Sequence, residues 1–564
     1  DWVHNFAQFM QIWVRLKHNT GPKVDDDISH SMETTYEYDV LNQLVKTTTP
    51  DAGITENVYD IQGNVRFSQD AQQEIDEKFS YVNYDRAGRP IESGVFDYSN
   101  SAALQFQNQD ELPALNPGET SVLTVVDEID GLNDTYCSEQ TFTLYDLPDE
   151  NTSPYYPFNT APYTNYKQKH LLGRVSKIWN ENSIMWYSYD MYGRVVWTIE
   201  YIIDAAIADY KTIDYEYDAA GNVTKTIYQK YETEYFEHRY AYNNGQQLIK
   251  VETSTDGLTY DQQANYSYYQ HGGLKRTEVG DKLQGIDYLY TIDGKLKAIN
   301  SPNLGIESGN PTFSDPGLDG EGTSLFYTDI FGMTIDYHTA DYIRAGTFVN
   351  YGLGTNEKYS GTINQIRWNT DEPTLGLDLT SSGKQNVYQY SYNDFNWITG
   401  ATFGDYTHSC NHNNNYVYNC PFPPTFDADA NNQFKISGIT YDKNGNIETF
   451  VRNGNSTTGI SMDDLDYHYA TTTQPDNDVV KINNRLTYVT DAVGSSGYTT
   501  DIENQSAANY TYNAIGEAIA SVGDDETYTY YQNGLPKEIK ATSTGYLKLK
   551  FEYNVLGQRL KKTI

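Results

Sequence analysis

The sequence predicts an all-β protein built from one long antiparallel sheet, and three observations support that prediction. First, a short phrase recurs every two to three dozen residues: Tyr, any residue, Tyr, Asp or Asn, two further residues and Gly. Second, the 564 residues exceed the roughly 250–300 at which one compact core stops growing, a limit that stacked repeats escape. Third, 53 Tyr and 42 Gly against 6 Met suit pleated strands joined by tight turns.

Each copy of the phrase is predicted to fold into one β-hairpin, as YEYDAAGNV at residues 215–223 illustrates. Tyr215 and Tyr217 are two residues apart in a strand, so both rings lie on the same face. Asp218 can accept a hydrogen bond from the backbone two residues on, and Gly221 can adopt the positive φ that closes the turn. Successive hairpins should then pair edge to edge.

Three stretches carry the repeats: residues 23–98, 171–300 and 433–564. The tyrosines, turn Asp or Asn residues and turn glycines predicted to build the hairpins are Tyr36, Tyr38, Asp39, Tyr59, Asp60, Gly63, Tyr84, Asp85, Gly88, Tyr187, Tyr189, Asp190, Gly193, Tyr215, Tyr217, Asp218, Gly221, Tyr441, Asp442, Gly445, Tyr510, Tyr512, Asn513 and Gly516.

Residues 1–22 differ in kind from the repeats. Their apolar residues follow a helical spacing and form one stripe: Trp2, Phe6, Phe9, Trp13 and Leu16. Gly21-Pro22 would end such a helix. We expect a short N-terminal helix, which is either a plug over an exposed sheet edge or the end of an upstream domain.

Three further stretches depart from the repeat. Residues 99–170 are rich in Asn, Pro, Thr and Asp, with only a partial unit at Tyr145 and Asp146, and we expect an insertion with loops. Residues 301–406 contain strand-like sequence, interrupted by a loop insertion rich in Gly, Pro and Asp at its start. Residues 407–432 form a loop rich in Cys, His and Asn.

That last loop contains the sharpest cluster of reactive side chains, namely His408, Cys410, His412 and Cys420. These are ligand types for zinc, but their spacing matches no standard finger or ribbon. A Cys410–Cys420 disulfide is a second reading, natural in an exported protein, and two free thiols are a third. We rank the disulfide first, free thiols second and the metal site third.

The charge balance and the motifs exclude several function classes. A net charge of −38 argues against nucleic acid as a partner, because that binding needs clustered Lys and Arg. The apolar runs are far shorter than the roughly 20 residues that a membrane-spanning helix requires. The sequence has no nucleophile elbow, P-loop or complete dinucleotide fingerprint. We therefore expect no catalytic residues and no cofactor.

The repeated phrase resembles the tyrosine–aspartate (YD) repeat of the RHS (rearrangement hot spot) family, most closely at residues 187–195 and 215–223. QGIDYLYTIDGKLKAIN at residues 284–300 is similar to a characteristic RHS segment, and FEYNVLGQRLKK at residues 551–562 to the last repeat before the family's core motif. The Asn- and Tyr-rich composition resembles that of members from the Bacteroidota, many of which are exported by the type IX secretion system.

The resemblance implies that the β-strip spirals into a hollow shell, or part of one. In polymorphic toxins of the family such a shell encloses a variable C-terminal effector, which is often released by self-cleavage at a core motif. That motif is expected only beyond Ile564, so no self-cleavage residues are assigned here.

We therefore expect a non-enzymatic shell segment of a large exported protein, secreted or on the cell surface, whose partner is its own C-terminal or encapsulated polypeptide. The alternative is a cell-surface adhesin or gliding-motility protein that meets secretion-machinery proteins or cell-surface glycans.

Overall fold

The structure is a computed structural model of the chain. It describes residues 18–20, 32–99, 106, 132, 134–150, 155–204, 209–302, 316–317, 319, 325–338, 341, 359–370, 385–407, 411–412, 418–419, 425–455, 460–473, 479–493, 498 and 501–564. Within these ranges no helix is long and apolar enough to cross a membrane.

Strands dominate the described residues. In the first part of the chain they are β1 (His18–Thr20), β2 (Glu33–Tyr38), β3 (Leu44–Thr49), β4 (Gly53–Tyr59), β5 (Val65–Asp70), β6 (Lys78–Tyr84), β7 (Pro90–Asp97), β8 (Cys137–Tyr145), β9 (Val175–Trp179), β10 (Ser183–Tyr189), β11 (Val195–Ile202), β12 (Tyr210–Tyr217), β13 (Val223–Tyr228), β14 (Phe236–Tyr242), β15 (Leu248–Ser254), β16 (Asp261–Tyr268), β17 (Leu274–Val279), β18 (Gln284–Tyr290) and β19 (Leu296–Ile299).

The remaining strands are β20 (Phe331–Asp336), β21 (Gln365–Thr370), β22 (Gln385–Tyr392), β23 (Ile398–Thr407), β24 (Asn411–His412), β25 (Tyr418–Asn419), β26 (Thr425–Ala428), β27 (Ile436–Tyr441), β28 (Ile447–Asn453), β29 (Ser461–Thr473), β30 (Val479–Asp491), β31 (Tyr510–Tyr512), β32 (Ala518–Ser521), β33 (Glu526–Tyr530), β34 (Pro536–Lys540), β35 (Leu547–Tyr553) and β36 (Arg559–Thr563). The helical pieces are short: α2 (Ala71–Ile75), η2 (Asp134–Tyr136), η3 (Pro157–Asn159) and η4 (Tyr163–Asn165).

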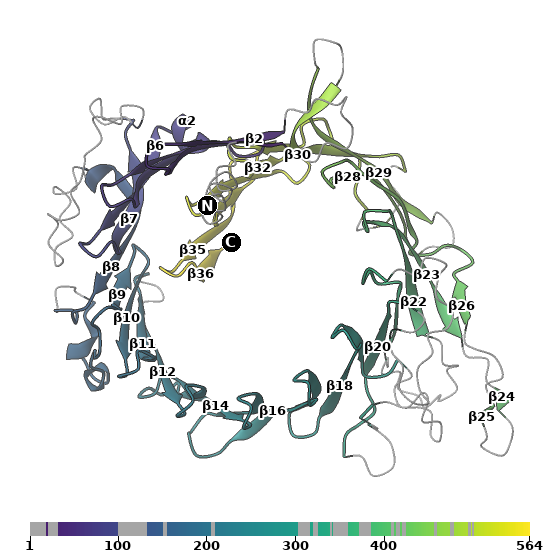
Figure 1. Cartoon of the computed structure of the whole chain (residues 1–564), viewed down its shortest axis with the longest axis horizontal. Helices are drawn as coiled ribbons and strands as arrows, with labels where there is room; N and C mark the ends of the chain where they lie inside the picture. Colours follow the sequence, from purple (N-terminus) through teal and green to yellow (C-terminus); the bar gives the residue numbers. More distant parts are fainter. Residues whose placement is uncertain are drawn as a thin grey trace, which may run out of the picture.

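The strands pair almost entirely with their neighbours in the chain, always antiparallel. One sheet holds 28 strands from β1 to β30, a second holds the six strands β31 to β36, and β24 pairs with β25 alone. In Figure 1 the long sheet curves round a common axis into a ring, and β35 and β36 are drawn inside its outline. The predicted all-β fold, a continuous antiparallel sheet of hairpins, is confirmed.

Several predicted segments need comment. The N-terminal helix through Trp2 to Leu16 lies outside the described residues, although β1 falls at the end of the 1–22 segment. Strand β8 lies within residues 99–170, so that stretch consists of two insertions on either side of a wall strand. Strand β26 lies within residues 407–432 and pairs with β23, so the end of that predicted loop also belongs to the sheet.

The two faces of the sheet have different environments, which β10 shows clearly. Trp186 is fully buried against Tyr163 and Tyr166 of the second insertion, and its Nε1–H donates to Asp149 Oδ2 at 2.8 Å. That insertion segment lies outside the ring, beside β9 and β10, in Figure 1. Because side chains alternate along a strand, Tyr187 and Tyr189 face the inside of the ring.

A second aromatic cluster occupies the same outer face near the start of the ring. It combines three phenylalanines of β5, β6 and β7 with Phe106 and Leu132 from the first insertion. Phe67 and Phe79 meet edge to face at 5.3 Å between centroids, the arrangement that aromatic quadrupoles favour. The insertions therefore supply hydrophobic cores that a single curved sheet lacks.

Candidate functional site

Each repeat turn is closed by the side chain of its first residue. Between β12 and β13, Asp218 Oδ1 accepts hydrogen bonds from the main-chain N–H groups of Ala220 and Asn222, both at 2.9 Å. Asp218 Oδ2 accepts the Asn222 side chain at 2.9 Å, and that bond holds the pKa of Asp218 below its ordinary value. Gly221 has φ +97°, a conformation that strains any residue with a Cβ.

The other predicted turns repeat this geometry. Main-chain N–H groups two and four residues on donate to the side-chain oxygens of Asp39, Asp60, Asp85, Asp190 and Asp442. Asn513 accepts the bond from four residues on, at 2.8 Å. Positive φ values occur at Gly63, Gly88, Gly193, Gly445 and Gly516. The turn at Asp39 has no glycine, and Asn42 takes the same place with φ 66°, which Asn tolerates better than most residues.

The second tyrosine of each phrase joins neighbouring repeats. The Tyr217 hydroxyl donates to the main-chain oxygen of Val195, where the return strand of the preceding hairpin begins, at 2.7 Å. The same bond is made by Tyr59, Tyr84, Tyr189, Tyr441 and Tyr512, to the oxygens of Leu44, Val65, Val175, Ile398 and Leu486. A hydroxyl bond of this kind supplements the main-chain bonds between strands.

The first tyrosine of each phrase lies two residues before the second tyrosine, on the same face of the strand and further from the turn. Tyr36, Tyr187, Tyr215 and Tyr510 belong to β2, β10, β12 and β31, and Tyr38 ends β2. The rings of Tyr187 and Tyr189 stack with centroids 6.5 Å apart. Burial raises the pKa of Tyr187 and Tyr215 above the ordinary phenol value.

One repeat is divided by the second insertion, and the partial unit recognised in the sequence at Tyr145 and Asp146 is completed by Gly173 and Arg174. Asp146 donates its N–H to the oxygen of Arg174 at 3.1 Å, and its Oδ1 accepts the N–H of Gly173 at 2.6 Å. Tyr145 donates to the oxygen of Pro90, as a second tyrosine does elsewhere. Residues 147–172 therefore leave the wall inside a turn and return to it in register.

A further turn was missed because its tyrosines are replaced. Asp429 Oδ1 accepts from the N–H groups of Asn431 and Gln433, at 3.0 and 2.8 Å. Asn432 takes the fourth place with φ 55°. The turn chemistry alone, Asp followed three residues later by Asn, was the available signal.

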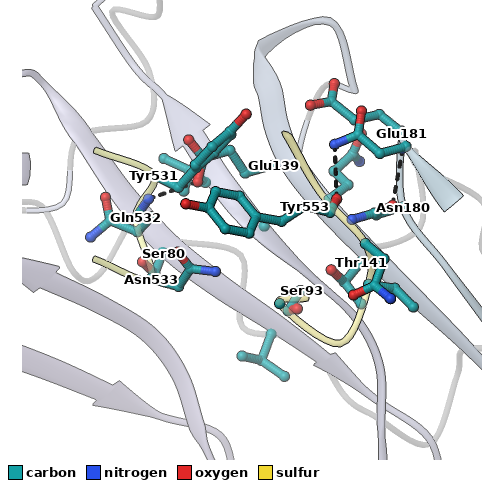
Figure 2. Close-up of a pocket in the computed structure, with 18 of the residues that line it drawn as sticks. Ser80, Ser93, Glu139, Thr141, Asn180, Glu181, Tyr531, Gln532, Asn533 and Tyr553 are labelled. Atoms are coloured by element: carbon teal, nitrogen blue, oxygen red, sulfur yellow. Dashed lines mark hydrogen bonds between the residues drawn. The ribbon is translucent and has the colours of Figure 1, made fainter. Parts of the chain in front are cut away.

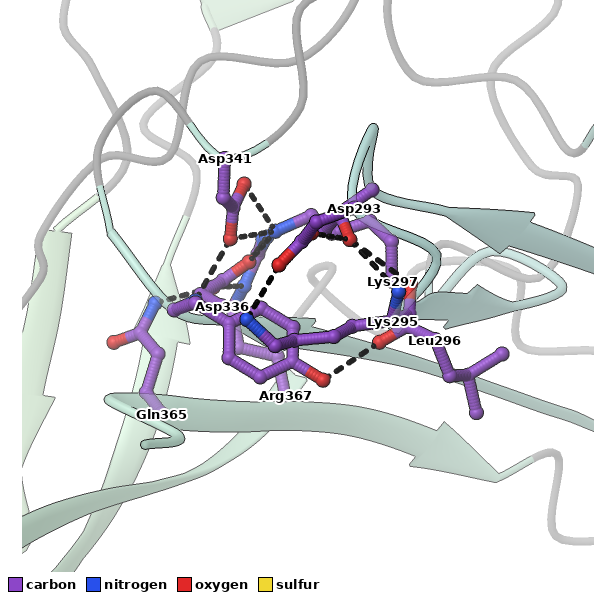
Figure 3. A network of polar contacts seen from close by, with 10 residues as sticks. Asp293, Lys295, Leu296, Lys297, Asp336, Asp341, Gln365 and Arg367 are labelled. Atoms are coloured by element: carbon purple, nitrogen blue, oxygen red, sulfur yellow. Dashed lines mark hydrogen bonds and ion pairs between the residues drawn. The ribbon is translucent and has the colours of Figure 1, made fainter. Parts of the chain in front are cut away.

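A charge cluster is buried where β19, β20 and β21 meet (Figure 3). Lys297 Nζ lies 2.6 Å from Asp336 Oδ1 and 3.0 Å from Asp341 Oδ1, and all three side chains are at most 1 % exposed. Asp336 Oδ2 also accepts from Gln365 at 2.7 Å and from Arg367 at 2.9 Å. Two cations thus balance two anions, as burial of charge requires.

The charges of this cluster fix its protonation. Burial opposes ionisation of Asp336, but Arg367 and Lys297 outweigh it and hold the pKa of Asp336 well below its ordinary value. Asp336 therefore stays ionised within the cluster. The arrangement locks three strands together.

The ring closes through a seam, which we define as the contacts between the repeat turns of β31–β36 and the opposite edge of the strands near the start of the chain. Ala514 N–H donates to Gln72 Oε1 at 3.0 Å, Gln532 N–H to Glu139 Oε2 at 2.8 Å, and Val555 N–H to Ser183 Oγ at 3.0 Å. The chain thus spirals, with β31–β36 forming a second layer against the first layer, β2–β30.

A pocket of about 330 Å³ lies along the seam (Figure 2). Tyr531 and Tyr553 of the second layer face Glu139 and Glu181 of the first layer across it. Burial, and then the charges of Glu181, Glu552 and Glu139, raise the pKa of Tyr531 to about 12. The pocket is therefore lined by carboxylates of the first layer and phenol rings of the second layer.

The predicted Cys/His site falls largely outside the described residues. His408, Cys410 and Cys420 are not described, and His412 is described only as part of β24. Over the described ranges, no group of three or more His, Cys, Asp and Glu residues could hold a metal ion. Cys137 begins β8 and packs against the first aromatic cluster.

No family model and no curated protein sequence matches the chain. Solved structures do match. The crystal structure of TcdB2-TccC3 without its hypervariable C-terminal region is 13 % identical, with a TM-score of 0.54 over 94 % of this chain and 20 % of that chain. The crystal structure of TcdB2-TccC3-Cdc42 is also 13 % identical, with a TM-score of 0.53 over 97 % of this chain and 22 % of that one. This chain spans about a fifth of the length of those it matches. Its long antiparallel sheet resembles the RHS shell of TcdB2-TccC3.

Proposed function

We propose that this chain forms part of the wall of an exported RHS-type shell, which encloses a polypeptide and acts without catalysis. The observation that carries the proposal is the spiral wall itself, with a shell-like fold over 94 % of the chain. The similar protein, TcdB2-TccC3, is described with a hypervariable C-terminal region, which that crystal structure lacks. By analogy, the enclosed polypeptide here is a C-terminal segment of the same protein or a separate cargo.

The construction of the wall suits enclosure. Within the first layer, strands pair in chain order with main-chain hydrogen bonds, so the backbone is protected from proteases, which need an extended substrate strand. The turn carboxylates and tyrosine hydroxyls add bonds within and between hairpins. The seam then joins one layer to the next.

Secretion is part of the same proposal. A net charge of −38 favours solubility in a protein that works outside the cell. Export by the type IX system and a cell-surface position are the finer forms of this proposal, suggested by the resemblance of the repeats.

Protease protection tests the proposal directly. An unstructured reporter segment with several trypsin sites is fused after Ile564 of the whole chain, and the same segment is fused to an unrelated compact carrier as the control. We expect the reporter to be cleaved at least tenfold more slowly behind this chain than on the control carrier.

Equal cleavage on both carriers would overturn enclosure. A glycan array on the same preparation separates the alternative, since specific glycan binding together with an unprotected reporter would favour an adhesin.

A further inference from the structure

The seam pocket exists because the first layer has small side chains on its inner face at this place. Tyr81 belongs to the aromatic cluster on the outer face, so Ser80 and Val82 face inward by alternation. Val82 lies two residues before Tyr84, at the place where many repeats have their first tyrosine, and it pairs with Ser93 of β7. These three inward-facing side chains all line the pocket of about 330 Å³. A ring at any of the three positions would fill part of that space.

Two phenol rings of the second layer line the same space, and their hydroxyl groups are already used. The Tyr531 hydroxyl donates to the main-chain oxygen of Phe551 at 3.1 Å, and the Tyr553 hydroxyl donates to that of Pro536 at 3.0 Å. The two rings are nearly perpendicular, at 87°, with centroids 5.8 Å apart (Figure 2). What they offer to a ligand is therefore ring surface, which attracts cations and stacks on flat groups.

Two carboxylates of the first layer complete the lining, and one of them has no partner. Glu139 Oε2 accepts the main-chain N–H of Gln532 at 2.8 Å. Glu181 is exposed in the link between β9 and β10, and no group among the described residues donates to its carboxylate. After burial, the charges of both carboxylates help to raise the pKa of Tyr531. The rings of the pocket therefore lie in the field of negative charge.

The chain supplies no cation to balance that charge inside the pocket. Within the part of the chain that the structure describes, no Lys, Arg or His lines it. Lys550 Nζ lies 2.9 Å from Glu552 Oε1, and Lys537 Nζ lies 4.8 Å from the centroid of Tyr531, but neither lysine lines the pocket. The contact of Lys537 shows that this ring accepts a cation. Phenol rings beside an unpaired carboxylate are therefore complementary to a cationic ligand.

We propose that the seam pocket binds the guanidinium group of an arginine side chain of the enclosed polypeptide. A guanidinium is planar, stacks on aromatic rings and donates two parallel hydrogen bonds to one carboxylate, so it matches both kinds of lining group. The pocket lies on the inner face of the first layer, which is the face that an enclosed polypeptide meets. The identity of the occupant rests on the enclosing wall proposed above, whereas the binding of a guanidinium by the pocket does not.

Isothermal titration calorimetry on the whole chain tests the pocket without any enclosed polypeptide. The probe is Nα-acetyl-arginine methylamide, and the control probe is its citrulline analogue, which has nearly the same shape and no charge. We expect a dissociation constant of about 0.1–1 mM for the arginine probe, and binding of the citrulline probe that is at least tenfold weaker. Equal binding of the two probes by the wild type, or no binding of the arginine probe in this range, would overturn the site.

Glu181→Gln locates the binding, because Glu181 accepts none of the hydrogen bonds of the seam. We expect this variant to bind the arginine probe at least about fivefold more weakly and the citrulline probe unchanged. Glu503→Gln is the matched control, since Glu503 is exposed and does not line the pocket. Melting temperatures of both variants show that they fold. A Glu181 variant that binds the arginine probe like the wild type would place the binding elsewhere and overturn the site.

A fused segment then tests the occupant. A flexible segment with several arginines is fused after Ile564, and the same segment with Gln in place of each Arg is the control. We expect the arginine segment to weaken binding of the free probe at least tenfold, because it occupies the pocket, and the Gln segment to leave that binding unchanged. Equal effects of the two segments would overturn the polypeptide as the occupant. A reporter without protease protection would instead overturn enclosure, because the free probe binds without it, so the two failures are distinguishable.

Discussion

Two kinds of joint hold this molecule together, and they depend on sequence differently. Within a layer, strands are joined by main-chain hydrogen bonds, which any residue except proline can make. Across the seam, main-chain donors meet particular side chains, such as Gln72, Glu139 and Ser183. The comparison shows that strand pairing itself needs no particular side chain, whereas each of these bonds across the seam needs one particular acceptor side chain.

High pH should weaken the wall most, because it acts on every repeat at once. Burial raises the pKa of Tyr392 and Tyr469 to about 12, against about 10 for an exposed phenol. Between these values the unfolded chain has lost protons that the folded chain keeps, so stability is complete below about pH 10 and falls as the pH rises towards 12.

Denaturant unfolding at pH 8 to 12, followed by tyrosine fluorescence and circular dichroism, measures this effect. A free energy of unfolding that stays constant up to about pH 12 would contradict the role of the tyrosine hydroxyls.

Removing the buried lysine should cause the largest loss from a single substitution. Lys297→Met leaves Asp336 and Asp341 buried with one cation fewer, at an expected cost of about 3–5 kcal/mol. The matched control is Lys295→Met, since the Lys295 side chain is 41 % exposed and its ion pair with Asp293 is screened by solvent, so its loss should cost much less. Thermal unfolding measures both, and equal melting temperatures would count against the cluster as a lock between strands.

A single strained turn should have a smaller, local effect. Gly221→Val forces a β-branched residue to φ near +97°, at a cost of about 1–3 kcal/mol. Hydrogen exchange should quicken in β12 and β13 and stay unchanged elsewhere. Gly245→Ala is the control, because Gly245 lies in a repeat turn without positive φ. Unchanged exchange in the Gly221 variant would remove the turn assignment.

The seam should respond least in overall stability and most in local access. Gln72→Ala with Glu139→Ala removes two acceptors, each worth about 1 kcal/mol. We expect the main unfolding transition to stay in place while limited proteolysis cuts β31–β36 faster. If the second layer resists cleavage as well as the wild type, the seam bonds do not hold it.

The repeats explain how far the sequence could predict the fold. The recurrence of Tyr, Asp and Gly at fixed spacing reports local bonds, such as those of Asp218, and local bonds need only a short stretch of chain. At Asp146 only a partial unit could be recognised, because its glycine, Gly173, follows a long insertion. The turn at Asp429 was missed because Tyr is absent beside it.

The seam and the buried cluster could not be predicted in the same way. Gln72 contacts Ala514 only because the curvature of all the strands between them brings the two layers together. The total curvature of the sheet is not encoded in any local sequence pattern. Nothing in the residues next to Lys297 and Asp336 in the sequence marks their charges as buried. Their burial depends on how β19, β20 and β21 pack, which the alternation of residues does not reveal.

The divided turn at Asp146 and Gly173 has a consequence for how such a molecule can change over time. A graft placed between the two residues leaves the hydrogen bonds of the turn intact and emerges on the outside of the ring. Segments inserted on the outer face can therefore vary in sequence without changing the curvature of the sheet. Each repeat turn is then a site where an insertion can be accommodated, and the outer face can change in sequence independently of the strands of the wall.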